Sequence, residues 1–267
     1  MIDIHSHFLY GLDDGARDID MSLAMLRQAE QLGILRILAT PHTNEHTTAQ
    51  IESLIIDRFD EISDLIGENN LDLEIKLAAE ISYNSNLLNW LDRSWALAGD
   101  RHRYMIFELP LQGIPLDISH TIFQLLLKKV VPVFAHPERN YNLQLEPEKL
   151  ITWVNQGALV QMNAGSIVGK FGKKCQRFSE RMLEARAVHI VASDAHDSDN
   201  RNYFVFKHAF QRVHDYIHSD YAQLLFVDNP RCIFEGHEVS IPDMREDKLY
   251  KGLGNKIFRR IEGWGQK

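Results

Sequence analysis

Short apolar runs alternate along the chain with longer segments whose apolar residues recur at helical spacing. Seven of these runs have the length and composition of β-strands: 1–6, 34–40, 73–81, 104–109, 130–135, 158–162 and 188–193. Because helical segments separate the strands, we expect parallel pairing. Seven β/α units favour a barrel of the TIM-like kind, with an eight-stranded barrel and an open sheet as alternatives.

The clearest helical segment lies between the first two predicted strands. Asp18 or Asp20 can cap its beginning, and Gly33 can stop it. Its apolar stripe consists of Leu23, Leu26, Ala29 and Leu32. The next predicted strand, 34–40, begins directly afterwards, as expected of a compact β/α unit.

The composition is that of a globular chain with a sizeable core. With 267 residues, 45% of them hydrophobic, residues 1–267 are expected to form one domain. The formal charge of −8 argues against broad nucleic-acid binding. Two cysteines fit a reducing compartment, and no export signal or membrane-spanning run is evident, so we expect a cytoplasmic protein.

The C-terminal segment differs from the rest of the chain in charge. Residues 243–267 contain seven Lys or Arg against four Asp or Glu, with Phe258 and Trp264 among them. We interpret this basic extension as a terminal helix packed by its aromatic side chains in preference to a dedicated binding tail. Peripheral association with a membrane through a partner protein stays open.

Histidines and carboxylates stand at the C-terminal ends of the predicted strands. They are His5, His7, His42, Glu80, Glu108, His136, Asp194 and His196. In a β/α barrel these strand ends converge on the face where active sites form. Each residue alone is more often structural than functional, but their recurrence at one end of the sheet indicates a shared metal site.

The residue types narrow the choice of metal. Five histidines and three carboxylates without a thiolate suit manganese, iron or zinc in a catalytic site. Eight ligands can serve two or three divalent ions, which would make the floor of the site electropositive. Such a site in an otherwise acidic chain is typical of phosphoester hydrolysis.

Arginines and aspartates near the predicted ligands are candidates for contact with the substrate. Arg139 follows His136 in His-Pro-Glu-Arg, and Arg201 follows His196. Guanidinium groups bind phosphate oxygens in a bidentate manner, so we expect both to bind phosphate. Asp13 and Asp14 lie in the turn Gly-Leu-Asp-Asp-Gly; Asp14 is our candidate general acid, with substrate steering and turn formation as the alternatives.

The order of the motifs resembles a known family. The motifs are Met-Ile-Asp-Ile-His-Ser-His, Gly-Leu-Asp-Asp-Gly-Ala, Ala-Thr-Pro-His, Ala-Glu-Ile, Phe-Glu-Leu-Pro, Ala-His-Pro-Glu-Arg and Ala-Ser-Asp-Ala-His. They resemble the polymerase-and-histidinol-phosphatase (PHP) superfamily. Within it they are most similar to the bacterial manganese-dependent protein-tyrosine phosphatases of capsule and exopolysaccharide systems.

The resemblance implies more than the residues alone. It implies a distorted seven-stranded β/α barrel, three Mn²⁺ ions and dephosphorylation of a membrane-associated tyrosine autokinase that controls polysaccharide export. By position it implies the eight residues above as ligands, with Glu80 as the bridge and Arg139 and Arg201 as phosphate binders. The chain departs from the family pattern after His42, where Thr43-Asn44-Glu45-His46 replaces the second histidine that the family pattern would have, and in its C-terminal extension.

Two further patterns have plain structural explanations. Cys175 and Arg181 match the C-x5-R spacing of cysteine-dependent phosphatases, but the segment lacks glycine and is predicted to be helical, so we reject that chemistry. His208, His214 and His218 fall on a predicted helix without an HExxH arrangement, which favours a solvated helix face.

Three functions are compatible with these residues. Phosphotyrosine hydrolysis on a protein is the leading hypothesis, and hydrolysis of histidinol phosphate, another small phosphomonoester or a phosphodiester is the second. The third is a metal-binding regulatory module without turnover, against which the complete ligand set argues. The sequence does not indicate an oligomeric state.

Overall fold

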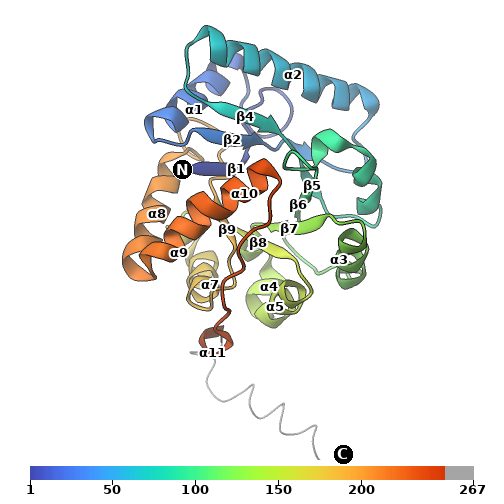
Figure 1. Cartoon of the computed structure of the whole chain (residues 1–267), viewed down its shortest axis with the longest axis vertical. Coiled ribbons are helices and arrows are strands. Elements are labelled where there is room, and N and C mark those ends of the chain that lie inside the picture. The colour runs from blue at the N-terminus through green and yellow to red at the C-terminus, as the bar shows by residue number, and fades with distance from the viewer. Residues whose placement is uncertain (250–267) are drawn as a thin grey trace, which may run out of the picture.

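Parallel strands occupy the centre of the molecule and helices surround them (Figure 1). This computed structural model describes residues 1–249. The predicted α/β class with parallel pairing is confirmed, because every pair of hydrogen-bonded strands among these residues is parallel. Most of the predicted extension 243–267 lies outside the described residues.

The strands form two hydrogen-bonded sheets. The smaller sheet has the order β1-β2-β4, with bounds Ile2–Ser6, Arg36–Ala39 and Glu74–Leu77. The larger has the order β3-β5-β6-β7-β8-β9, with bounds His42–Thr43, Glu80–Ser82, Tyr104–Glu108, Val131–Ala135, Leu159–Asn163 and Ile190–Ala192. A parallel bridge between Ser6 and Ala195 links β1 to the residues after β9.

The strand count differs from the prediction because one predicted strand is divided and a short strand that was not predicted follows another. The predicted strand 34–40 contains β2, and β3 follows it beyond Pro41, which has no N–H for a ladder bond. The segment 73–81 divides into β4 and β5, because Ala78 donates to Ala39 O whereas Ala79 donates to Ala96 O. The described residues therefore form nine strands in two sheets that are not closed into one.

Helices cover the outside of the strands. Their bounds are α1 Ile19–Gln31, α2 Ala49–Glu68, α3 Ile118–Leu127, α4 Tyr141–Leu145, α5 Pro147–Asn155, α6 Ala164–Ile167, α7 Lys173–Glu184, α8 Phe204–Tyr216, α9 Ser219–Gln223, α10 Asn229–Glu235 and α11 Glu246–Leu249. The predicted cap and stop of the first helix are confirmed. Asp18 Oδ1 accepts a hydrogen bond from Met21 N at 2.9 Å, and Gly33 has φ of +74° just beyond α1.

Two groups of buried apolar residues hold these layers together. One contains Ile106, Val133 and Leu159 from neighbouring strands. The other contains residues such as Phe134, Val160 and Met162 together with the apolar faces of the surrounding helices. Along β8 the side chains alternate between the two groups, as a pleated strand requires, so each strand has one face toward the helices and one toward the other strands.

Short irregular segments complete the described chain. Turns of 3₁₀ helix occupy Leu87–Asp92, Ser94–Ala96 and Pro137–Arg139, and a π-helical turn occupies Leu224–Asp228. Among residues 1–249, no helix combines the length and the apolar content needed to cross a bilayer.

Candidate metal centre

All eight predicted ligands meet in one cluster. His42 and Glu80 begin β3 and β5, and the other six lie at or just beyond the C-terminal ends of β1, β6, β7 and β9. Four overlapping groups have donor atoms within 4.8 Å of one another: His7, Asp14, His42 and His196; His5, His7 and Glu80; His5, His136 and Asp194; and His42, Glu80 and Glu108. The groups share residues, so they form one continuous cluster. It contains the eight predicted residues and also Asp14.

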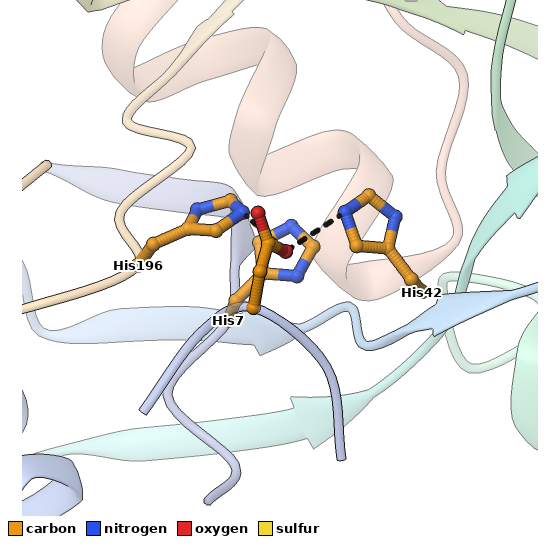
Figure 2. A group of neighbouring side chains, drawn as sticks. His7, His42 and His196 are labelled. Atoms are coloured by element: carbon orange, nitrogen blue, oxygen red, sulfur yellow. Dashed lines mark ion pairs between the residues drawn. The ribbon is translucent and has the colours of Figure 1, made fainter. Parts of the chain in front are cut away.

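The imidazoles come from segments far apart in the sequence. His7 follows β1, His42 begins β3 and His196 follows β9. Figure 2 shows the three rings turned toward a common region. Their ring centroids lie 3.9 Å apart for His7 and His196 and 4.6 Å apart for His7 and His42. Parallel strand order therefore brings together residues that no local sequence contact joins.

Glu80 lies in the middle of the cluster and is fully buried. Its Oε2 lies 3.1 Å from His5 Nε2, 3.3 Å from His7 Nε2 and 3.0 Å from His42 Nδ1. Its Oε1 lies 2.6 Å from His136 Nε2. Burial opposes ionisation of this carboxyl, but the positive charges of His5 and His136 outweigh burial and hold its pKa well below the ordinary value.

Asp194 is the second buried carboxylate of the cluster. Its Oδ1 lies 3.7 Å from His5 Nε2, 3.6 Å from His7 Nε2 and 3.4 Å from His196 Nδ1. Burial opposes ionisation here as well, but the charges of His5, His136 and Arg201 hold the pKa of Asp194 below its usual range.

Several buried polar atoms in the cluster make no hydrogen bond. They are His42 Nδ1, Glu80 Oε2, Asp194 Oδ1 and His196 Nε2. A buried polar atom without a partner costs about 1–3 kcal/mol. Nitrogen and oxygen atoms directed at one region and left without hydrogen-bond partners fit divalent cations, so the residues present fit the predicted metals.

The histidine pKa values show how the protein balances these carboxylates without a metal. Burial opposes protonation of His7, but contacts with Asp13 and Glu80 raise its pKa to about 10. Burial likewise opposes protonation of His136, and Glu80 raises its pKa. Burial and the charge of His7 lower the pKa of His196. Protons thus supply the positive charge, and a metal ion has to displace them.

The turn after β1 places its two aspartates differently. Asp13 Oδ2 accepts hydrogen bonds from His7 Nδ1 and from the backbone N–H of His42, each at 2.9 Å. Asp14 has a side chain that is 63% exposed, and its Oδ1 lies 3.4 Å from His42 Nε2 and 3.3 Å from His196 Nε2. Asp13 therefore orients two histidine-bearing segments, whereas Asp14 lies at the solvent side of the cluster.

Both predicted arginines reach the cluster. Arg201 Nη2 donates to Asp194 Oδ2 at 2.8 Å, and Arg139 Nη1 lies 3.5 Å from the same oxygen. The guanidinium of Arg139 stacks over the ring of Phe171 at 5.0 Å. The two arginines line a cavity of about 390 Å³ with Asp14, His42, Ser82, Tyr83, Glu108, Leu109, Pro110 and Leu111.

Two ligand positions carry backbone conformations that L-residues rarely adopt. His136 has φ of +32° and Asp194 has φ of +53°. Such positive values cost free energy and persist where the surrounding structure imposes them. His136 directly follows β7, and Asp194 is the second residue after β9. At both positions the chain turns while the side chain still faces the cluster.

Some residues around the cluster were not predicted. Gln161 and Asn163 are fully buried at the end of β8, and Glu138 is buried between His136 and Arg139. The signal for Asn163 was present in the sequence, because it is a polar residue directly after the predicted strand 158–162. An amide at a strand end is a weaker signal than a histidine or a carboxylate, because amides are less common metal ligands.

Other residues that the sequence analysis discussed are not part of the cluster. Cys175 lies in α7, as the predicted helix required, and burial raises the pKa of its thiol. Arg181 donates to Leu249 O. The prediction for His218 was wrong, because α8 ends at Tyr216 and His218 instead precedes α9. The side chain of His46 is 86% exposed.

Comparison with known proteins agrees with this geometry. Residues 1–235 match a family model described as capsular polysaccharide synthesis, CpsB/CapC. The chain is 33% identical to the tyrosine-protein phosphatase YwqE of Bacillus subtilis, with 84% of this chain and 91% of the relative covered. It is 30% identical to the tyrosine-protein phosphatase CpsB of Streptococcus pneumoniae, with 87% and 98% covered.

Solved structures give the same result. A crystal structure from work on YwqE of B. subtilis and CpsB of S. pneumoniae, described as metal-dependent tyrosine phosphatases, matches with a TM-score of 0.85 and 31% identity over 92% of this chain and 98% of that one. A histidinol phosphate phosphatase of Lactococcus lactis shares only the fold, with a TM-score of 0.55 and 11% identity over 85% of this chain and 96% of that one. The chain therefore belongs to the CpsB/CapC family of capsular polysaccharide synthesis proteins.

Proposed function

We propose that this chain is a metal-dependent protein-tyrosine phosphatase. The observation that carries the proposal is the placement of two buried carboxylates, Glu80 and Asp194, among five histidines and next to Arg139 and Arg201 at a cavity. The relatives YwqE and CpsB are named tyrosine-protein phosphatases. Hydrolysis of a phosphomonoester is the chemistry that such a cluster serves best.

The proposed ligands are the eight residues predicted from the sequence. His5, His7, His42, Glu80, Glu108, His136, Asp194 and His196 would hold up to three divalent ions, with Mn²⁺ proposed and iron or zinc as alternatives. When bound, such ions stabilise the negative charge that develops on phosphoryl oxygens and lower the pKa of water. The unpaired donor atoms of His42, Glu80, Asp194 and His196 support this assignment.

Arg139 and Arg201 would bind the phosphate oxygens. Both side chains are 26% exposed, so each can reach a group in the cavity while it stays tied to Asp194. The ring of Phe171 packs against the guanidinium of Arg139 and helps to hold it in place. Holding both forks in place lowers the entropy lost when the substrate binds.

We assign Asp14 to metal binding or substrate positioning in preference to general-acid catalysis. It lies close to His42, His196 and Arg201, and contact with His196 holds its pKa below the usual range, so it is a carboxylate at neutral pH. A group that is already ionised has no proton to donate to the leaving tyrosine oxygen.

The cavity suits an aromatic phosphoester on a larger molecule. Tyr83, Leu109 and Pro110 contribute to its lining on the side of Glu108. Given the family's role in capsular polysaccharide synthesis, we propose a phosphorylated tyrosine kinase of that system as the substrate and the cytoplasm as the location. Peripheral contact with a membrane would then come through the kinase.

We also propose that residues 1–267 form one domain with 243–267 as an extension. Two features support a distorted seven-stranded barrel: β3 continues the path of β2, and β5 continues that of β4. The Ser6–Ala195 bridge lies where β1 and β9 would meet.

Comparison of substrates tests the proposed function. The manganese-loaded protein should hydrolyse a phosphotyrosine peptide faster than histidinol phosphate or a phosphodiester, and chelated protein and His136→Ala should be inactive. Faster turnover of histidinol phosphate would indicate the small-molecule alternative. Binding of a phosphorylated kinase peptide without turnover by the loaded protein would indicate the regulatory module.

A further inference from the structure

Strand β8 supplies none of the eight proposed ligands, yet its end carries two buried amides. Gln161 and Asn163 are fully buried and lie on the same face of the strand, since they are two residues apart. The side chain of Met162, which lies between them in the sequence, points to the opposite face of the strand. It packs in the core beneath the helices and accepts a contact from Ser179 Oγ at 3.1 Å.

The two amides join two proposed ligands by an unbroken chain of hydrogen bonds. His5 Nδ1 lies 2.8 Å from Gln161 Oε1. Gln161 Nε2 donates to Asn163 Oδ1 at 3.0 Å, and Asn163 Nδ2 donates to Asp194 Oδ2 at 2.6 Å. The backbone of Asn163 is fixed as well, because its N–H donates to Glu138 Oε1 at 3.0 Å.

The carboxylate at one end determines the direction of the whole chain. An ionised Asp194 only accepts hydrogen bonds, so Asn163 must present its amide nitrogen. The carbonyl of Asn163 then faces Gln161, which must donate to it. The carbonyl of Gln161 is left to face His5, and therefore His5 Nδ1 must be the nitrogen that carries hydrogen.

This direction leaves the metal-facing atoms of both ends free to bind a metal ion. When a metal ion displaces the second proton of His5, the remaining hydrogen is on Nδ1 and the lone pair of Nε2, which lies 3.1 Å from Glu80 Oε2, faces the cluster. Asp194 Oδ2 is taken by Asn163 and Arg201, so Oδ1, which makes no hydrogen bond, is the oxygen that faces the cluster.

We propose that Gln161 and Asn163 act as one amide relay that sets the tautomer of His5 and the orientation of Asp194 together. The affinity of the centre for divalent ions then depends on a strand that contributes no ligand. Both are positioning residues, since neither reaches the atoms that would contact an ion. Outer partners of metal ligands typically account for about 10–100-fold in metal affinity.

A double-mutant cycle on metal binding tests the relay. The variants are Gln161→Met, Asn163→Leu and the double variant, with Met162→Leu as the matched control on the opposite face of β8. Dissociation constants for Mn²⁺ are measured by chelator competition, and the visible spectrum of the Co²⁺-loaded protein reports ligand geometry. Gln161→Ser and Asn163→Ser break the same relay and replace any apolar variant whose circular dichroism shows that it is not folded.

Each single variant should weaken Mn²⁺ binding by about 10–100-fold and change the Co²⁺ spectrum. The double variant should bind Mn²⁺ about as weakly as the weaker single variant, and Met162→Leu should match the unaltered protein in both measurements. If the fold-loss in Mn²⁺ affinity of the double variant equals the product of the two single losses, the two residues act separately. If the single variants bind Mn²⁺ as tightly as the unaltered protein, the two residues do not position the ligands. Either result overturns the relay, and neither readout depends on phosphatase activity.

Discussion

The carboxylate of Asp13 is hydrogen-bonded to Nδ1 of His7 at 2.9 Å. This contact folds the turn after β1 back onto the residue that the strand delivers to the cluster. The same carboxylate oxygen accepts the backbone N–H of His42, so one side chain fixes two histidine-bearing segments. The orientation of His7 therefore depends on a neighbour outside the proposed ligand set.

We predict that Asp13→Ala weakens metal binding by about 10–100-fold, because His7 loses the acceptor that directs its Nε2 inward. Chelator competition with Mn²⁺ measures the change. The control is Asp18→Ala, which removes an exposed helix cap away from the cluster and should leave affinity unchanged. Equal affinities for Asp13→Ala and Asp18→Ala would refute the orienting role.

Removal of either arginine should lower turnover while the metal stays bound. Arg139→Ala and Arg201→Ala each remove a donor proposed to bind the phosphate, and loss of one such donor costs about 10²–10³-fold in kcat. Lysine at either position should recover part of the activity, since it restores charge without the planar fork. Steady-state kinetics and metal analysis together check this, and a variant that lost its metal would not count as evidence for phosphate binding.

Cys175→Ser should leave activity nearly intact. The thiol lies in the first turn of α7, where burial raises its pKa and so opposes formation of the thiolate that cysteine chemistry requires. Hydrolysis of a phosphotyrosine peptide by the variant provides the measurement. Abolished hydrolysis at normal metal content would favour cysteine chemistry over metal chemistry.

A buried histidine away from the cluster predicts a pH-dependent stability. His189 is 1% exposed, its Nδ1 accepts a hydrogen bond from Val160 N, and burial lowers its pKa from 6.5 to about 4. Between these values the unfolded chain binds more protons than the folded one. The stabilisation that neutral His189 contributes to the folded protein is therefore fully present above pH 6.5 and is lost as the pH falls toward 4.

The comparison between unaltered protein and His189→Asn isolates this effect from the other groups that titrate. In the chelated proteins, lowering the pH from about 7 to about 5 should reduce the free energy of unfolding by about 2 kcal/mol more in the unaltered protein than in the variant. Denaturant unfolding at the two pH values measures the difference. The same pH dependence in both proteins would contradict the lowered pKa.

Much of the fold was predictable because it depends on local pattern. The predicted strands 104–109, 130–135 and 158–162 correspond to β6, β7 and β8, whose apolar runs are bounded by polar or turn residues. The short strand β3 and the break within 73–81 were not predicted. They depend on which distant carbonyl each backbone N–H reaches, such as Ala96 O for Ala79, and no local pattern records that.

The candidate site likewise has a part that the sequence predicts, the proposed ligands, and a part that it does not, the side chains that orient them. The eight histidines and carboxylates at the ends of the predicted strands were expected to meet, because parallel strands align their C-terminal ends, and in the structure they form one cluster. The contact of Asp13 with His7 and the links from Gln161 and Asn163 to the cluster follow from how a turn and a neighbouring strand pack in space. Sequence spacing does not specify such partners.

The most direct test of the account is restoration of activity to the chelated protein. Chelated protein is titrated with Mn²⁺ while bound metal and hydrolysis of a phosphotyrosine peptide are measured on the same samples, with His136→Ala in parallel. We predict no hydrolysis by chelated protein, recovery in step with bound metal and little recovery in the variant. Full hydrolysis by chelated protein, or metal binding with no recovery, would contradict the proposed metal-dependent phosphatase.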